Sequence, residues 1–519
     1  MNRLYTLLFL SLAALTTSAQ TLGDQDGDDE QAASEGLHYR VEMQASLSTG
    51  DHEPLWLNAN KYGLSSLDKS NGYLRASLQR PLQNDEGRKW GWGAGLDAAV
   101  AYGFTSSFVL QQAYVEGRWL HGVLTVGSKE YPLELKNPRL SSGSQTLGIN
   151  ARPIPQVRLA LPDYYALPFT KGWVSLKGHI AYGRPTDEGW QKDFTGRQSR
   201  YNEGTYYHSK AGYIKIGNDY RFLPVSLELG LEMGAQFGGT SYNTGYGYPV
   251  KNEGGIKGAW HALIPGGGET NELGSAYENA SGNQLGSWLM RLNFDYDTWY
   301  LGLYADHFFE DHSAMFFLDY DGYGSGPEWD VKKKHRYFVY SLKDIQLGLD
   351  FRLKKNAWIN NLLVEYLYTK YQSGPIYHDH AQGLPDHLGG TDSYYQHGIY
   401  TGWQHWGQVM GNPLYRSPLY NTDGKITVED NRFRALHFGL SGTPGSLHYR
   451  LLATVQKGYG TYGAPFDNPR RNLSLLAEAT YALRGWAEGV SIRLGLGLDR
   501  GSLLGDNTGG QLTFIYQVP

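Results

Sequence analysis

The chain has no cysteine among its 519 residues, so neither a disulfide framework nor a lipid-modified cysteine contributes to its structure. Beyond the N-terminus no run reaches the ~18 apolar residues that a membrane-spanning helix requires. The mean hydropathy of -0.48 is also too polar for a helical membrane protein. The formal net charge is only -5, so bulk charge gives no reason to expect nucleic acid as a partner.

The N-terminus has the pattern of a secretory signal. Arg3 precedes an apolar run and a small-residue cleavage site that ends at Ala19. We therefore expect residues 1–19 to be a signal peptide and the acidic residues 20–36 to be a flexible lead-in. A single folded unit is expected over residues 37–519, because no linker interrupts that part of the chain.

The body of the chain contains about eighteen stretches in which apolar and polar residues alternate. In residues 39–48 the odd positions are apolar and the even positions are polar or charged, and residues 225–235 again have apolar odd positions. Charges on one face throughout would be costly in lipid, so that face is expected to line a polar lumen. The pattern predicts an all-β, transmembrane antiparallel β-barrel of about 18 strands with long extracellular loops.

A soluble β-sandwich or β-helix would alternate in the same way, but aromatic residues at the strand ends favour a membrane girdle. These residues are Trp90, Trp92, Tyr102, Trp119, Trp173, Tyr182, Trp299, Tyr300, Trp358, Tyr371 and Trp486.

The lengths of the connections predict the orientation of the barrel. Connections from even- to odd-numbered strands are short, for example Thr443-Pro444-Gly445, whereas the long ones all leave odd-numbered strands. This asymmetry is typical of barrels in the bacterial outer membrane, which have short periplasmic turns and long surface loops. Eighteen strands would enclose a water-filled lumen unless loops or a plug fill it. The long segments lie near 130–155, 183–205, 238–285, 310–337 and 372–431.

One motif carries a resemblance to a known family. The segment Asn150-Ala-Arg152-Pro153-Ile-Pro155 resembles the motif of the Wzi family of outer-membrane capsule-assembly proteins, and the chain layout is similar. The resemblance implies a lectin-like protein that holds capsular polysaccharide at the cell surface. It places the family motif on Asn150, Arg152, Pro153 and Pro155.

Sugar recognition uses aromatic faces and planar polar groups, and acidic polymers also require cations. The segment 372–431 supplies rings that we expect to be exposed, and Arg158, Arg200 and Lys210 add cations near two earlier loops. Alternatively, the rings pack on one another to close the barrel mouth or lie at the level of the lipid headgroups. The cations would then form lumen ion pairs or pair with lipopolysaccharide phosphates, and Arg152 would be a structural pin. The candidate polysaccharide-binding residues are Arg152, Arg184, Trp190, Arg197, Tyr395, Trp403, His405, Trp406, Tyr415 and Arg416.

Signals for metal binding are weak. Asp319, Asp321 and Asp330 echo a calcium loop, and residues 421–430 do so partially, but Asp-Gly turns explain both patterns. A histidine-rich stretch at 378–387 lacks a helix to organise it. We expect no metal and no cofactor.

Catalysis also lacks a convincing set of residues. Glu228 and Glu232 share a strand face but lie roughly 13 Å apart by strand rise, which is too far for either mechanism of glycoside hydrolysis. We therefore predict a non-enzymatic protein that binds surface polysaccharide and helps assemble or anchor a capsule. A substrate-selective porin is the alternative, and a lipid- or glycan-cleaving barrel ranks below both. Outer-membrane lipid, lipopolysaccharide and polysaccharide-export proteins are the further partners expected.

Overall fold

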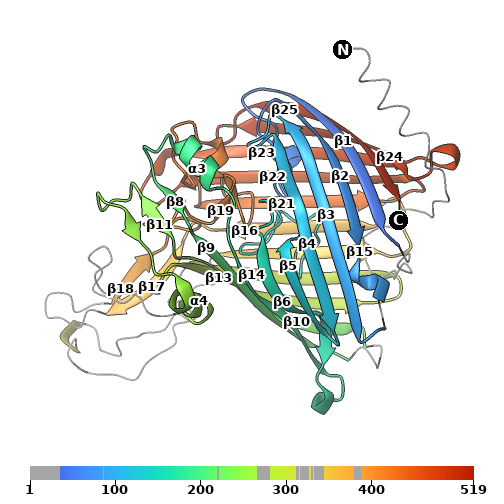
Figure 1. Cartoon of the computed structure of the whole chain (residues 1–519), viewed down its shortest axis with the longest axis horizontal. Helices are drawn as coiled ribbons and strands as arrows, with labels where there is room; N and C mark the ends of the chain where they lie inside the picture. The colour runs from blue at the N-terminus through green and yellow to red at the C-terminus, as the bar shows by residue number, and fades with distance from the viewer. Residues whose placement is uncertain are drawn as a thin grey trace.

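The computed structural model describes residues 36–85, 87–218, 221, 223–265, 281–310, 315, 326–328, 331, 344–378 and 387–518. Within these residues, one sheet of 18 strands closes on itself (Figure 1). Each wall strand pairs antiparallel with its neighbours in the chain, and the first strand pairs with the last, from Tyr39 opposite Val518 to Thr49 opposite Thr508. The predicted all-β transmembrane barrel of about 18 strands is confirmed.

The wall strands follow one another in chain order and leave no open edge. They are β1 (His38–Thr49), β2 (Ser70–Arg80), β3 (Trp90–Tyr102), β4 (Phe108–Trp119), β5 (Gly122–Ser128), β6 (Gln156–Ala166), β7 (Val174–Gly183), β9 (Tyr206–Ile216), β10 (Val225–Phe237), β13 (Asn283–Asp295), β14 (Trp299–Glu310), β15 (Ile345–Leu353), β16 (Asn361–Tyr368), β21 (Phe433–Gly442), β22 (Leu447–Gly460), β23 (Pro465–Ala482), β24 (Val490–Gly501) and β25 (Asn507–Val518).

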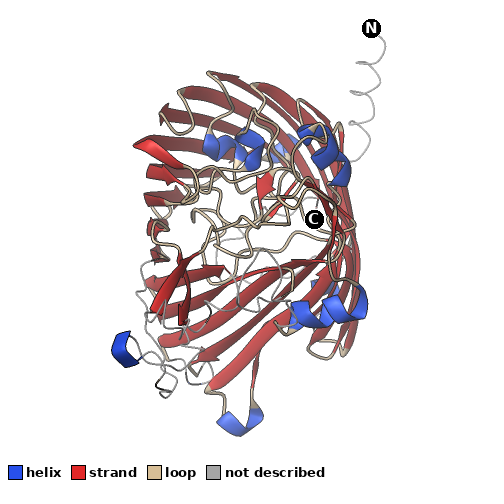
Figure 2. Cartoon of the chain, turned by 90° about the vertical axis from the view of Figure 1, so that its left-hand side faces the viewer, coloured by secondary structure: helices blue, strands red, loops and turns tan. Residues whose placement is uncertain are grey.

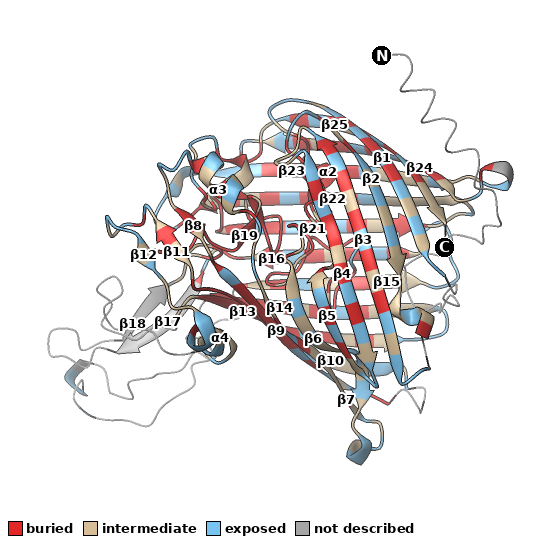
Figure 3. Cartoon of the chain, viewed as in Figure 1, coloured by how far each residue is buried: buried red, intermediate tan, exposed pale blue. Residues whose placement is uncertain are grey.

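The barrel wall has polar side chains on its inner face and apolar side chains on its outer face. In β1, Glu42 and Ser46 are each only 1% exposed and face inward, whereas Met43 and Leu47 are 52% and 70% exposed on the outside. The same alternation of buried and exposed positions runs across the strands in Figure 3. A solvated protein would not present so much apolar surface, so the outer face is suited to lipid and the inner face to polar contacts. In the described part of the chain, no helix is long and apolar enough to cross a membrane.

Most of the described girdle aromatics lie exposed at strand ends as predicted. Trp90 and Trp119 stack with ring centroids 5.8 Å apart at the end where the turns are short. The prediction is wrong for Tyr300, whose hydroxyl points into the lumen and contacts Arg291 and Asn293. The side chain of Trp486 lies outside the described residues.

The asymmetry of the connections is confirmed. All five predicted long segments leave odd-numbered wall strands, and residues 50–69 form a further long connection at the same end. We call this the loop end and the opposite end the turn end. The loop end also carries short elements: α2 (Leu55–Asn58), α3 (Glu188–Thr195), α4 (Gly255–Leu263), β8 (Tyr201–Glu203), β11 (Thr240–Tyr242), β12 (Val250–Lys251), β17 (Ser373–His378), β18 (His387–Thr391), β19 (Gln404–His405) and β20 (Gln408–Val409).

Three of the long loops fold into the barrel, and their path inside the ring of strands is visible in Figure 2. We call residues 50–69, 129–155 and 392–432 the plug. Lys136 of the plug forms a buried ion pair with Asp306 of the wall, and the Ser141 hydroxyl donates to Glu365 over 2.6 Å. Polar wall residues thus have plug residues as partners instead of water, which anchors the loops inside the lumen.

The plug has an apolar core of its own. Trp56, Leu140, Tyr394 and Trp403 belong to one buried cluster drawn from all three plug loops and the wall. The Trp56 indole N–H also donates to the Thr454 hydroxyl of β22 over 3.1 Å. The barrel therefore contains a packed core at its loop end, in addition to the apolar surface that it presents outward.

Beneath the plug lies a cavity of about 1760 Å³. Residues of the turn end line it on one side, and plug residues such as Gly148, Trp403 and Met410 line it on the other. The lumen is therefore filled at the loop end and hollow toward the turn end.

Candidate functional site

A buried carboxylate joins two long loops at the loop end. Asp187 precedes α3 and is 0% exposed. Its Oδ2 accepts hydrogen bonds from the Trp406 backbone N–H over 3.1 Å and from the Gln404 amide over 3.2 Å, and its Oδ1 accepts from Gln191 over 3.1 Å. A buried charge requires such partners, so this carboxylate fixes loop 392–432 against α3.

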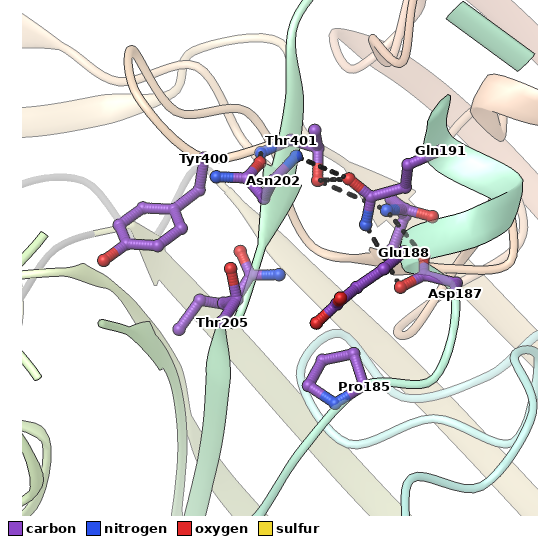
Figure 4. A pocket seen from close by; sticks show the side chains of 10 residues that line it. Pro185, Asp187, Glu188, Gln191, Asn202, Thr205, Tyr400 and Thr401 are labelled. Carbon is purple, nitrogen blue, oxygen red and sulfur yellow. Dashed lines mark hydrogen bonds between the residues drawn. The ribbon is translucent and has the colours of Figure 1, made fainter. Parts of the chain in front are cut away.

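A polar pocket surrounds this junction (Figure 4). The Asn202 amide oxygen accepts from the Thr401 backbone N–H over 2.9 Å, and the Gln191 amide oxygen accepts from the Asn202 backbone N–H over 3.0 Å. The Thr205 hydroxyl lines the pocket, is buried and has no hydrogen-bond partner among the residues that the structure describes. The pocket volume is only about 10 Å³, which is the space of roughly one water molecule. A sugar ring would therefore lie on the rim instead of entering.

The rim carries cationic and aromatic side chains. Arg184 is 57% exposed at its side chain and pairs with Glu188 over 2.9 Å. Arg197 is exposed at the end of α3. Trp190 of α3 is half-buried, stacks on Phe194 at 4.9 Å and lies so close to Gly407 that an added Cβ there would come within 2.6 Å of its ring.

Trp406 connects this rim to the Wzi-like motif. Its indole N–H donates to the Thr186 hydroxyl over 3.2 Å, and the Arg152 guanidinium lies 4.4 Å from its ring centroid. Burial lowers the pKa of the Arg152 guanidinium to about 10, so Arg152 remains a cation at neutral pH. Arg152 also donates to Thr105 over 2.7 Å, and it is 8% exposed. Its predicted alternative role as a structural pin is the one that the geometry supports.

His405 reinforces the same contact. Its Nδ1 lies 2.9 Å from the Arg152 carbonyl oxygen, and its Nε2 accepts from the Thr186 backbone N–H over 3.0 Å. Burial lowers the pKa of His405, and these partners suit a neutral ring that donates from Nδ1. His405 thus holds two loops together and is 0% exposed.

The whole motif has an architectural role in this chain. The Asn150 amide nitrogen donates to the Val409 carbonyl over 3.0 Å, while its amide oxygen accepts from the Asn60 backbone N–H over 3.1 Å. The carbonyl of Pro153 accepts from Ser128, and that of Pro155 accepts from the Arg184 backbone N–H over 3.1 Å. Asn150 therefore joins all three plug loops, and the prolines end the plug segment where β6 begins.

Several rings expected to be exposed are buried. Tyr395 and Trp403 are 1% exposed and Tyr415 is 0% exposed, so the expectation that they form an open stacking surface is wrong. The Trp403 indole N–H donates to the Thr146 carbonyl over 2.9 Å, and the Tyr415 hydroxyl donates to Gln145 over 2.9 Å. Their burial favours the alternative in which the rings pack to close the mouth: Tyr395 packs on Tyr415 with ring centroids 4.1 Å apart, and Trp403 stacks on Tyr207 of β9 at 5.7 Å.

The remaining cations have different environments. Arg416 pairs with Glu429 over 2.6 Å, and Arg200 donates to the carbonyls of the segment 397–398. Arg158 lies in the lumen with its guanidinium 3.9 Å from the Tyr131 ring centroid. Of the ten candidate residues, Arg184 and Arg197 are exposed at the rim, and Trp190, Trp406 and Arg416 are half-buried there.

Gly234 and Asp187, which determine this packing, carry no recognisable signal in the sequence. Trp403 rests on Gly234 of β10, where an added Cβ would come within 2.2 Å of the indole ring. The partners of Asp187 are the amides of Gln404 and Gln191 and the Trp406 backbone N–H. A glycine in a strand can signal the close approach of another group, but the partner cannot be read from the sequence.

The described residues offer no metal site. No group of three or more His, Asp or Glu side chains among them is placed to hold an ion. Asp430, in the partial calcium-loop pattern of residues 421–430, instead accepts hydrogen bonds from the backbone N–H groups of Tyr459 and Gly460. The first calcium-loop pattern lies outside the described residues, and so does most of the histidine-rich stretch; that pattern consists of Asp319, Asp321 and Asp330.

The two lumen glutamates have separate partners. Glu228 accepts from Tyr164 over 2.8 Å and from Asn293 over 2.8 Å. Glu232 accepts from Tyr213 over 2.7 Å and contacts the plug through Ser144. Both carboxylates are thus engaged with wall and plug residues rather than with one another, as the strand spacing predicted.

Comparisons with known proteins support the fold. The chain is similar to Wzi of Escherichia coli, an outer-membrane protein involved in group 1 capsule assembly and a carbohydrate-binding β-barrel, with a TM-score of 0.54 and 12% identity over 92% of this chain and 83% of that chain. Acinetobacter baumannii OccAB4 and Pseudomonas aeruginosa OprD also align, with 10% identity over 93% of this chain and over 97% and 95% of theirs, at TM-scores of only 0.44 and 0.42.

Sequence comparisons add nothing to this. No protein-family profile matches the chain, and no curated protein matches it. At 12% identity the similarity to Wzi concerns the fold, which is that of an outer-membrane β-barrel.

Proposed function

We propose that the protein resides in the bacterial outer membrane, binds surface polysaccharide at its loop end, and helps to assemble or anchor a capsule. The observation that carries the proposal is the rim around Asp187, where Arg184, Trp190 and Trp406 are held in place over a network of amides and carboxylates. Aromatic faces suit sugar C–H surfaces, and guanidinium groups suit the carboxylates of acidic polymers. The fold shared with carbohydrate-binding Wzi supports the same conclusion.

The filled lumen favours binding over conduction. The plug occupies the loop end through buried ion pairs and its own apolar core, so a polymer at the surface would meet a fixed platform. Repeated weak contacts along a polymer can produce avidity without a deep pocket, which suits a pocket of only about 10 Å³. Polymer delivered by export proteins would be retained at this face without any chemical step.

Retention of purified capsular polysaccharide by the intact protein tests the proposal. The W190A/W406A variant removes the two rim rings, whereas W358A removes a ring that is 70% exposed at the turn end and serves as the matched control. Losing two stacking surfaces should weaken retention roughly tenfold or more. Heat-modifiable gel mobility checks that both variants still form barrels. Equal retention of the polysaccharide by both variants would exclude this rim as the binding surface.

A selective porin is the second candidate, and the cavity of about 1760 Å³ beneath the plug is the observation that favours it. Planar bilayer recordings separate the two functions. Steady open-channel current, together with no retained polymer, would establish the porin. Release of product from lipid or capsule substrates would instead indicate an enzyme, which the described residues give no reason to expect.

A further inference from the structure

The helix α4 lies outside the barrel wall instead of in the plug. It packs on the outer ends of β9 and β10, and Ala262 of the helix clusters with Ala235 and Phe237 of β10 (Figure 1). These two β10 residues belong to the outward face, because the intervening Gln236 shares the inward face with Glu232, which contacts the plug. The helix α4 therefore lies over the membrane-facing side of the wall.

The helix covers polar groups that would otherwise face lipid. Lys210 lies opposite Met233 in the register and so points outward, where a charge is costly. Its ammonium group donates to the carbonyls of Ala262 and Leu263 at the C-terminus of α4, the end at which a helix stabilises a cation. His208 points outward beside it, is 0% exposed and packs in a tilted arrangement against Tyr182, with ring centroids 4.4 Å apart. This arrangement explains a cation that the sequence analysis placed near a binding loop.

The uncovered side of α4 is apolar. Ile256 and Trp260 lie four residues apart on the helix, and Ile264 is the C-cap residue that follows it; we call these three residues, which are 92%, 57% and 52% exposed, the apolar stripe. Next to this stripe, Lys257 and His261 form a polar stripe, and both pair with Glu253 over 2.5 Å. A helix with one face on the protein, one apolar and one charged has the pattern of a helix lying in a membrane interface.

The position of α4 along the barrel axis also agrees with a helix that lies in a membrane interface. The strand β9 is 11 residues long, so its ends lie about 33 Å apart along the strand. At a tilt of ~40°, this corresponds to roughly 25 Å along the barrel axis, which matches the ~25 Å apolar band of such barrels. Ile216 at the turn end and Tyr206 beside α4 are 41% and 42% exposed. The helix therefore lies at the outer boundary of the band.

We propose that α4 is an interfacial anchor whose stripe Ile256, Trp260 and Ile264 inserts among the lipids of the outer leaflet. The stripe continues the apolar outer surface of β9, where Ile214 is 42% exposed, so one lipid environment covers both. Lys257, whose side chain is 74% exposed, then faces the water above the membrane. This role is independent of polysaccharide binding and requires only that the barrel span a membrane.

The absence of cysteine from the chain makes the test direct, because single cysteines can be spin-labelled without background. Variants I256C, W260C and K257C of the full chain are labelled and reconstituted in phosphatidylcholine vesicles. Their collision rates with oxygen, which partitions into lipid, and with a water-soluble nickel complex are then compared. The variant I214C reports the lipid-facing wall, and R197C reports an exposed loop outside the membrane.

The expected result is that I256C and W260C resemble I214C, with oxygen favoured, while K257C resembles R197C. If I256C and W260C resemble R197C, the stripe faces water and the proposal is overturned. Dipolar broadening between labels at 256 on separate molecules would show that a second copy covers the stripe, which also overturns it. If I214C itself reports water, the barrel is not in the membrane, and that outcome refutes the membrane placement on which the proposed function depends.

Discussion

The buried ion pair between Lys136 and Asp306 makes the closure of the barrel testable. Their side chains are 1% and 0% exposed, and the Lys136 ammonium also donates to Gln346 over 2.9 Å and to the Gly143 carbonyl over 3.3 Å. All three ammonium protons therefore have acceptors inside the protein. The pair links the plug segment 129–155 to the wall strands β14 and β15.

The substitution Lys136→Met leaves the Asp306 carboxylate buried with the Gln145 backbone N–H as its one remaining donor in the described part of the chain. Breaking a buried pair in this way costs roughly 3–5 kcal/mol. If that cost falls on docking of the plug, the undocked population rises by about two to more than three orders of magnitude. We expect current bursts in planar bilayers and faster tryptic cleavage after Arg139, which lies in the plug.

Two further variants decide whether the reasoning is sound. K136M/D306M removes both charges, and replacing a buried pair by apolar groups is often close to neutral, so quiet recordings should return. K425M removes one partner of an ion pair whose side chains are 59% and 43% exposed, and should change neither readout. If K136M is as silent and as protected as the unmodified protein, the pair does not hold the plug.

The other predictions concern the loop end. Burial lowers the pKa of His405 below its ordinary 6.5, so its contribution to stability is complete above about pH 6.5 and is lost as the pH falls toward the lowered value. The melting temperature should therefore be lower at pH 5 than at pH 7.5, and H405Q should reduce this difference. In Gly234→Ala the new methyl group would displace the Trp403 ring, which should cost roughly 1–3 kcal/mol and shift tryptophan fluorescence; an unchanged spectrum and melting temperature would contradict the close contact. Arg152→Lys loses the planar group stacked on Trp406, so a loss of about 1 kcal/mol is expected in denaturant unfolding, and an unaltered midpoint would remove Arg152 from the packing argument.

The proposal for α4 and the proposed polysaccharide site use different faces of the molecule. One concerns the outward side of the wall, and the other concerns the rim around Asp187. Variants of Trp260 should therefore leave polymer retention unchanged, whereas variants of Trp406 should leave the lipid exposure of α4 unchanged. A common loss in both assays would indicate that the loop end had unfolded as a whole.

The sequence by itself determined the strands of the wall and the end of the barrel at which the long connections lie. A strand has a side-chain period of two, so alternation such as that in residues 39–48 assigns each residue to lipid or lumen without knowledge of its partners. The lengths of the connections likewise follow from the chain alone, and they placed five long loops at one end.

Only the tertiary structure decided which loops enter the lumen and which lie outside. The composition of loop 392–432 is polar and aromatic, and such a composition suits either polymer binding or packing inside the barrel. The sequence therefore predicted an exposed Trp403, whereas in the structure Trp403 is buried against Gly234 on a distant strand. The position of Lys210 was equally unpredictable, because the carbonyl groups that accept its hydrogen bonds belong to a helix in another loop. Burial in loops depends on contacts between segments far apart in the chain, and no local periodicity records such contacts.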